Sequence, residues 1–113
     1  MEVYPFASYA AMLGVLPFPK KSLEGRLQRQ LLLHSKKVEV PDPMRIFEEI
    51  TRFRLLQGIL RLDNLYTPPE LDALIAAYTA WQTASEPQNI NMIGHEKEGM
   101  IVLPVSELQP KYQ

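Results

Sequence analysis

Two carboxylates, Glu2 and Asp72, are the residues whose type and setting best suit chemistry. Asp72 stands in a predicted helix of leucine, isoleucine and alanine, where a buried carboxylate needs a cation, a metal ion or a hydrogen-bond donor. Glu2 stands in a predicted strand end, just before Pro5. Carboxylates placed in this way suit an oxygen-ligated Mg²⁺ or Mn²⁺ ion, which can drive phosphodiester hydrolysis. Each residue also has a simpler interpretation, Asp72 as a partly solvated residue near a helix start and Glu2 as an exposed carboxylate.

A basic segment, residues 20–37, is the main charge asymmetry of the chain. It contains six lysines and arginines and one carboxylate, whereas the whole chain has a formal net charge of −1. We predict that Lys20, Lys21, Arg26 and Arg29 form a phosphate-contacting face, which would position nucleic acid without reading its sequence. The alternative is a solvated amphipathic helix with no ligand.

Composition excludes several other kinds of site. The 113 residues contain no cysteine, which removes disulfides, thiolate zinc sites and cysteine nucleophiles. An apolar content of 46% is ordinary for one soluble domain, so we expect a single domain over residues 1–113. The apolar runs are shorter than the roughly 18–20 residues of a membrane span, and no signal peptide is visible. We therefore expect a cytoplasmic protein with no membrane partner.

Prolines and capping residues divide the chain into short elements. We predict a strand that ends at residues 2–4, a helix over 8–13, and a second helix over 22–35 capped by Ser22. Asp42 and Pro43 predict the start of a third helix, in which Ile46, Phe47, Ile50, Phe53 and Leu56 would form one apolar face.

The remaining elements are a long helix and a hairpin. Thr67 and Glu70 form a capping-box pattern that predicts a helix to about residue 84. This helix is apolar nearly all round, so we predict that it is central and that Trp81 lies in the core. Residues 91–93 and 100–103 predict a β-hairpin around a polar turn over 94–99. The predicted class is a helix-dominated α+β fold with a short N-terminal strand and a C-terminal hairpin.

Three stretches together resemble a known family: EVYPFAS (residues 2–8), LDALIAAYTAW (71–81) and EGMIVLP (98–104). They are similar to the C-terminal half of the predicted RNase H-like nucleases, domain of unknown function 429, and the similarity covers the whole chain. The resemblance implies that Glu2 matches the acid of the fourth strand and Asp72 the acid of the final helix, two ligands of a catalytic divalent metal. The family's N-terminal half, with its first three strands and leading aspartate, has no counterpart here.

Two functions follow as hypotheses. The first is a partial RNase H-like metal-dependent nuclease, a hydrolase that is inactive alone. It needs a companion chain carrying the missing half, or a second copy in a homo-oligomer. The second is a non-catalytic helical module that dimerises or binds a protein through the helix around Trp81. The first predicts that Mn²⁺ stabilises the fold through Asp72, and the second predicts that it does not.

Overall fold

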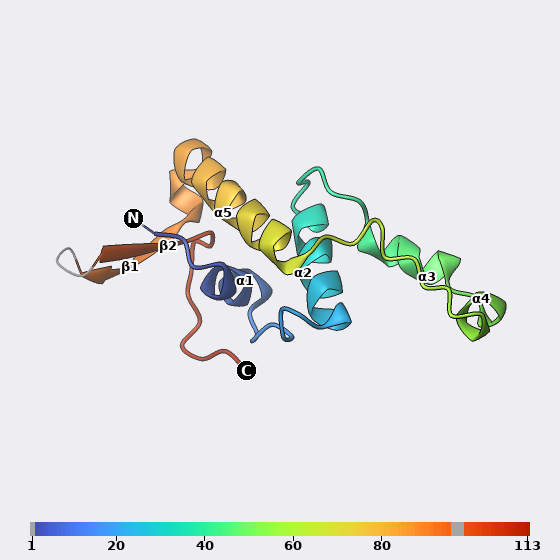
Figure 1. The fold of residues 1–113 in the computed structure, drawn as a ribbon. Helices are drawn as coiled ribbons and strands as arrows, with labels where there is room; N and C mark the ends of the chain where they lie inside the picture. The colour runs from blue at the N-terminus through green and yellow to red at the C-terminus, as the bar shows by residue number, and fades with distance from the viewer. Residues whose placement is uncertain (1, 96–98) are drawn as a thin grey trace.

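The computed structural model describes residues 2–95 and 99–113 and shows an α+β fold with helices and one two-stranded antiparallel sheet. The molecule is elongated, with the hairpin at one end and α4 at the other (Figure 1). Its extents are 56 × 27 × 20 Å and its radius of gyration is 16.1 Å. A compact domain of this length has a radius of gyration of about 13 Å. A substantial part of the chain therefore lies away from the main body.

Helix α5, Pro68–Ser85, begins at the predicted capping box. The Thr67 hydroxyl accepts a hydrogen bond from the Glu70 N–H at 3.4 Å, and the Glu70 carboxylate accepts one from the Thr67 N–H at 3.1 Å. Helix α2, Leu23–Ser35, begins after Ser22, whose hydroxyl accepts from the Gly25 N–H at 2.9 Å. Both helix starts are confirmed because each depends on residues only three positions apart.

Helix α1, Pro5–Leu13, starts earlier than predicted. Proline suits the first helical position because its missing N–H is not needed there, so Pro5 opens the helix instead of closing a strand. The predicted N-terminal strand is reduced to a single parallel bridge between Glu2 and Ile101. The Glu2 N–H donates to the Met100 carbonyl at 2.7 Å, and the Val102 N–H donates to the Glu2 carbonyl at 2.9 Å.

The core lies where α1, α2 and α5 meet. Its buried residues are Tyr9, Leu33, Val40, Leu71 and Ile75. Helix α5 contacts α1 and α2, and its buried residues, Leu71, Ile75, Thr79 and Gln82, share one face of the helix. The prediction that Trp81 belongs to the core is wrong, because its side chain is 54% exposed on the uncovered side of α5.

The predicted third helix is divided into short pieces. A 3-10 turn, η1 (Pro43–Arg45), leads into α3 (Ile46–Glu49), and α4 (Arg52–Leu56) follows after a break. Ile50 has an extended backbone, and Thr51 caps α4 by accepting from the Arg54 N–H at 3.1 Å. A continuous helix was predicted from an apolar face, but none of residues 46–56 is buried against the described part of the chain, so burial does not hold the pieces in one helix.

The hairpin is confirmed as β1 (Asn91–His95) and β2 (Gly99–Leu103), with Ile93 paired to Ile101. Residues 96–98 of the predicted turn, and with them the first residue of the EGMIVLP stretch, lie outside the described residues. Within the described ranges, no helix combines the length and the apolar character needed to cross a bilayer.

Candidate nucleic-acid interface

A tight turn holds two of the predicted lysines beside α2. The Ser22 N–H and hydroxyl both donate to the Pro19 carbonyl, at 3.1 and 2.6 Å. A Cβ atom on Gly25 would overlap that same carbonyl oxygen, so glycine is needed for the turn to pack against the helix. Lys20 and Lys21, which lie inside the turn, are therefore fixed relative to α2.

Two adjoining pockets bring together the four predicted basic residues and Asp72. One is lined by Lys20, Lys21, Arg26, Pro68, Pro69 and Asp72, and the other by Tyr4, Pro5, Phe6, Lys20, Arg29 and Asp72. The pockets share Lys20 and Asp72, and we call them together the cationic groove. Four cations and one carboxylate line it, so its electrostatic potential favours an anionic ligand.

Arg26 ties α2 to the segment that leads into α5. Its Nε donates to the Tyr66 carbonyl at 2.9 Å, and its Nη2 donates to the Leu65 carbonyl at 3.1 Å. These bonds use two of the five N–H donors of the guanidinium. The geometry therefore holds Arg26 in place and leaves it donors for a phosphate in the groove.

Arg29 forms part of the groove wall and is only 2% exposed. Its Nη1 donates to the carbonyls of Phe18 (2.8 Å) and Gly25 (3.1 Å), and the guanidinium lies 5.3 Å from the centre of the Tyr9 ring. Burial lowers the pKa of Arg29, whereas Tyr9 and Asp72 act in the opposite direction. Its Nε is buried and makes no hydrogen bond within the described part of the chain.

Asp72 lies in the second turn of α5 and is half-buried. Burial is the main cause that raises the pKa of the nearby Tyr9 hydroxyl. The Arg29 charge lowers this pKa, and the Asp72 charge raises it. Asp72 shares its two pockets with Lys20, Lys21, Arg26 and Arg29, so cationic side chains lie in its neighbourhood.

Glu2 is exposed and lines neither pocket of the groove. Hydrogen bonding to the Glu2 carboxylate and the Glu2 charge raise the pKa of Tyr4. Tyr4, not Glu2, therefore reaches the pocket that contains Asp72. The structure does not bring the two predicted metal ligands into one pocket.

The described residues do not by themselves fit a Mg²⁺ or Mn²⁺ site. Across residues 2–95 and 99–113, no group of three or more histidine, aspartate or glutamate side chains is arranged to hold a metal ion. Asp72 also shares its pocket with Lys20 and Arg29, whose charges would repel a divalent cation. A metal at Asp72 stays a prediction, and it requires further oxygen ligands from outside these residues.

Two exposed aromatic rings at the groove were missed from the sequence. Tyr4 and Phe6 are 48% and 57% exposed and line the pocket that contains Lys20. Their position on either side of Pro5 was the available signal, because Pro5 opens a helix and leaves both rings near its exposed start.

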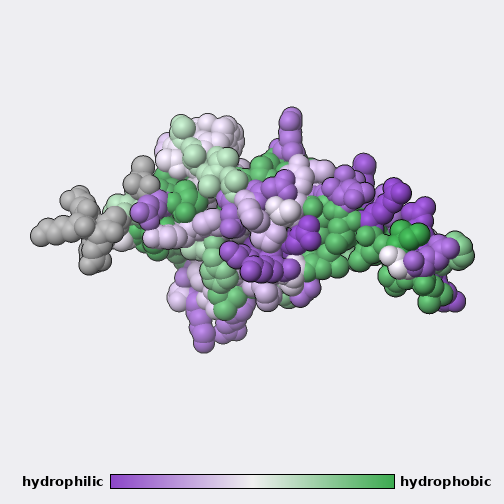
Figure 2. Space-filling model, in the orientation of Figure 1, coloured by the Kyte–Doolittle hydropathy of each residue, from purple (hydrophilic) through white to green (hydrophobic). Residues whose placement is uncertain are grey.

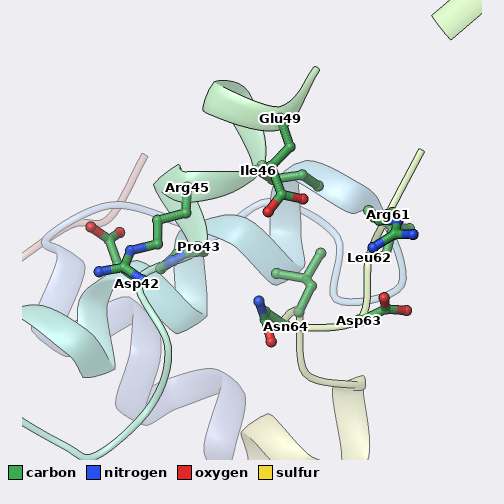
Figure 3. Close-up of a pocket in the computed structure, with 10 residues that line it drawn as sticks. Asp42, Pro43, Arg45, Ile46, Glu49, Arg61, Leu62, Asp63 and Asn64 are labelled. Carbon is green, nitrogen blue, oxygen red and sulfur yellow. The ribbon is translucent and has the colours of Figure 1, made fainter. Parts of the chain in front are cut away.

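A further pocket, of about 170 Å³, lies at the base of α3 (Figure 3). Acidic side chains (Asp42, Glu49 and Asp63) and two arginines (Arg45 and Arg61) line it together. The positive and negative charges that line this pocket nearly balance. The pocket therefore lacks the excess positive charge that favours a phosphate in the cationic groove.

No family model, curated protein or solved structure matches the chain. The resemblance to RNase H-like nucleases therefore rests on the three sequence stretches alone, and the fold adds no support to it.

Proposed function

We propose that this protein binds single-stranded nucleic acid along the cationic groove. The observation that carries the proposal is the convergence of Lys20, Lys21, Arg26 and Arg29 on two pockets that share one lysine. Lys20 and Lys21 are exposed and contact backbone phosphates. Such phosphate contacts account for most of the affinity that does not depend on sequence. Arg26 adds a donor from a side chain that is already held in place.

The aromatic rings favour a single strand over a duplex. Tyr4 and Phe6 are exposed beside Lys20, and bases stack on such rings with little sequence preference. Only unpaired bases present their faces to a protein side chain in this way. A strand whose phosphates follow Lys20 and Lys21 therefore places bases against Tyr4 and Phe6.

Within an RNase H-like nuclease, this groove would be the part that holds the substrate. Across residues 2–95 and 99–113 no carboxylate cluster forms a metal site, so the proposal for these residues is binding of nucleic acid. Cleavage would require metal ligands beyond those in residues 2–95 and 99–113, as a companion polypeptide or a second copy could supply, with Asp72 as the contribution of this part of the chain.

Fluorescence anisotropy with a labelled 12-nucleotide oligothymidine tests the proposal. We expect Lys20→Ala combined with Lys21→Ala to weaken binding and to reduce the slope of log K against log salt by about 1.4, two single-strand phosphate contacts. Lys36→Ala combined with Lys37→Ala is the matched control, because it removes the same charge beyond the other end of α2. An equal loss in both double variants would overturn the proposed site.

The stacking part has its own variant. Phe6→Ala should weaken single-strand binding by about tenfold, since stacking on one ring contributes about 1–3 kcal/mol. The same variant should leave the weaker binding of a duplex of equal length unchanged. If both ligands lose affinity equally, Phe6 does not stack on bases and the preference for single strands is refuted.

A helical interaction module is the second candidate function, and the exposure of Trp81 favours it. Trp81 is 54% exposed and its ring centre lies 6.0 Å from that of Tyr78, so a bulky aromatic surface is open on α5. Trp81→Ala tests this candidate: loss of a copurifying protein with nucleic-acid affinity retained would support it. No change in copurifying proteins would exclude Trp81 as a contact.

A further inference from the structure

One of the two pockets of the cationic groove, which we call the aromatic pocket, is lined by Tyr4, Pro5, Phe6, Lys20, Arg29 and Asp72. Its volume is about 390 Å³, within the range of about 300–1,000 Å³ that is usual for sites of small ligands. Hydrophobic residues also gather at the end of the molecule that carries α3 and α4 (Figure 2), but none of residues 44–61 is buried there. The aromatic pocket differs because one of its polar side chains, Arg29, is 2% exposed and is therefore held in a fixed position.

Arg29 can offer hydrogen-bond donors to a ligand in this pocket. Its Nη1 donates to the carbonyls of Phe18 and Gly25, whereas its Nε is buried without a partner in the described part of the chain. The two N–H groups of Nη2 make no hydrogen bond with any residue in the ranges 2–95 and 99–113. Because a guanidinium donates and never accepts, a ligand that contacts Arg29 needs an acceptor atom.

Asp72 lines the same pocket from α5 and, when it is ionised, can only accept hydrogen bonds. The Asp72 charge is close enough to Arg29 to oppose the lowering of the Arg29 pKa by burial. A ligand that contacts both side chains therefore needs an acceptor for Arg29 and donors for Asp72. A carboxylate has two oxygens, so two adjacent donors bind it more strongly than one.

Guanine is the base whose polar edge answers both groups. Its N1–H and N2–H donors are adjacent and can bond the two oxygens of one carboxylate, and its O6 and N7 atoms are acceptors for an arginine. Thymine has one N–H donor, and adenine and cytosine each have one amino group, so none of them presents donors from two adjacent nitrogen atoms. Stacking on Tyr4 and Phe6 distinguishes the bases little, so a preference among bases depends on Arg29 and Asp72.

We propose that the aromatic pocket selects guanine from a single strand, with Asp72 accepting from N1–H and N2–H of the base and Arg29 donating to O6. This inference rests on the proposed function, because Lys20 and Lys21 hold the strand whose base enters the pocket. Lys20 lines both pockets of the groove, so a phosphate bound to it lies next to the aromatic pocket. The guanine belongs to a strand and not to a free nucleotide, since the second pocket offers cations for further phosphates.

Fluorescence anisotropy with three labelled 12-nucleotide strands tests the base preference. The strands are oligothymidine, alternating guanine and thymine, and the same alternating strand with hypoxanthine, which lacks the N2 amino group, in place of guanine. We expect the guanine strand to bind about tenfold more tightly than oligothymidine, the discrimination that one bidentate base contact provides. The hypoxanthine strand should lose most of this gain. Equal affinities for the guanine and hypoxanthine strands would overturn the proposal.

Asp72→Asn tests the residue that selects guanine. This variant should bind the guanine strand no more tightly than oligothymidine, whereas its affinity for oligothymidine should not fall, because a negative charge has been removed. Asp63→Asn is the matched control, since Asp63 lines the pocket at the base of α3, and it should keep the full preference for guanine. A preference that survives in Asp72→Asn would overturn the assignment of this residue.

Oligothymidine separates this inference from the proposed function. If it binds through Lys20 and Lys21 but guanine adds no affinity, the groove binds nucleic acid and the guanine pocket is overturned. If none of the three strands binds, both proposals are overturned. Guanosine 5′-monophosphate should compete only at concentrations well above that of the guanine strand, because it brings a single phosphate to the groove. Competition at equal concentration would overturn the strand as the source of the base.

Discussion

The Tyr9 hydroxyl donates a hydrogen bond to the Leu71 carbonyl at 2.7 Å, and both side chains are fully buried. The bond joins α1 to the start of α5, and the Arg29 guanidinium of α2 lies over the same tyrosine ring. Asp72 directly follows Leu71, and Tyr4 and Phe6 stand at the start of the helix that carries Tyr9. One tyrosine therefore connects all three helices that position the cationic groove.

Tyr9→Phe removes this hydrogen bond and keeps the ring. We expect the free energy of unfolding to fall by about 1 kcal/mol, the usual net contribution of one such bond. Urea denaturation followed by circular dichroism measures the change. Tyr112→Phe is the control, since the Tyr112 hydroxyl accepts only an exposed bond of 3.2 Å from the Gln109 N–H. If the control loses as much stability as Tyr9→Phe, the buried bond has no special role.

Signals between neighbouring residues made some elements predictable. The Thr67 and Glu70 capping box and the Ser22 cap each depend on residues three positions apart, and both helices start where expected. The prediction of a continuous third helix was wrong because apolar periodicity identifies one face of a helix but does not show whether another element covers that face. The prediction that Trp81 lies in the core was wrong for the same reason, because Trp81 lies on the exposed side of α5.

The candidate site could be predicted only in part. The basic residues were visible as a charge cluster, but their convergence on Asp72 depends on the packing of α2 against α5, which no short-range pattern encodes. The need for glycine at position 25 arises from the Pro19 carbonyl six residues earlier. Such a contact becomes visible only when the turn and the helix are placed in space.

Gly25→Ala tests how the lysine turn is held. Glycine to alanine within a helix normally stabilises a protein by about 0.5–1 kcal/mol. Here the added methyl group would overlap the Pro19 carbonyl, so we expect a loss of about 1–3 kcal/mol from the forced shift. The affinity for oligothymidine should fall as well, because Lys20 and Lys21 move with the turn. Thermal denaturation decides the sign, and a rise in Tm would contradict the packing of this turn.

Asp72→Asn removes the one carboxylate of the cationic groove. We expect single-strand affinity to rise about fivefold, because a negative charge at about 4 Å from a surface phosphate costs on the order of 1 kcal/mol or more. Anisotropy titration measures this change, with Asp63→Asn in the other pocket as the control. A fall in affinity would show instead that Asp72 assists binding.

Metal titration of the same variant examines the predicted role of Asp72 as a ligand. Because Lys20 and Arg29 share the Asp72 pocket and their charges repel a divalent cation, we expect Mn²⁺ to leave the Tm of the chain alone unchanged. An increase in Tm that disappears in Asp72→Asn would contradict this expectation and assign the ion to Asp72.

Glu70 gives the start of α5 a specific dependence on pH. Hydrogen bonds from the Thr67 N–H and then from the Thr67 hydroxyl lower the pKa of Glu70 below its ordinary value of 4.5. A pKa that is lower in the folded state adds stability above the unfolded value, and this stability is lost as pH falls through the folded pKa. We therefore expect Glu70→Gln to lose less stability than the unmodified chain as the pH falls from 4.5 through the lower folded-state pKa. Urea denaturation across this interval measures the difference.

Glu24→Gln, in the first turn of α2, is the control. An unchanged pH dependence in Glu70→Gln would show that the capping box does not favour the ionised carboxylate.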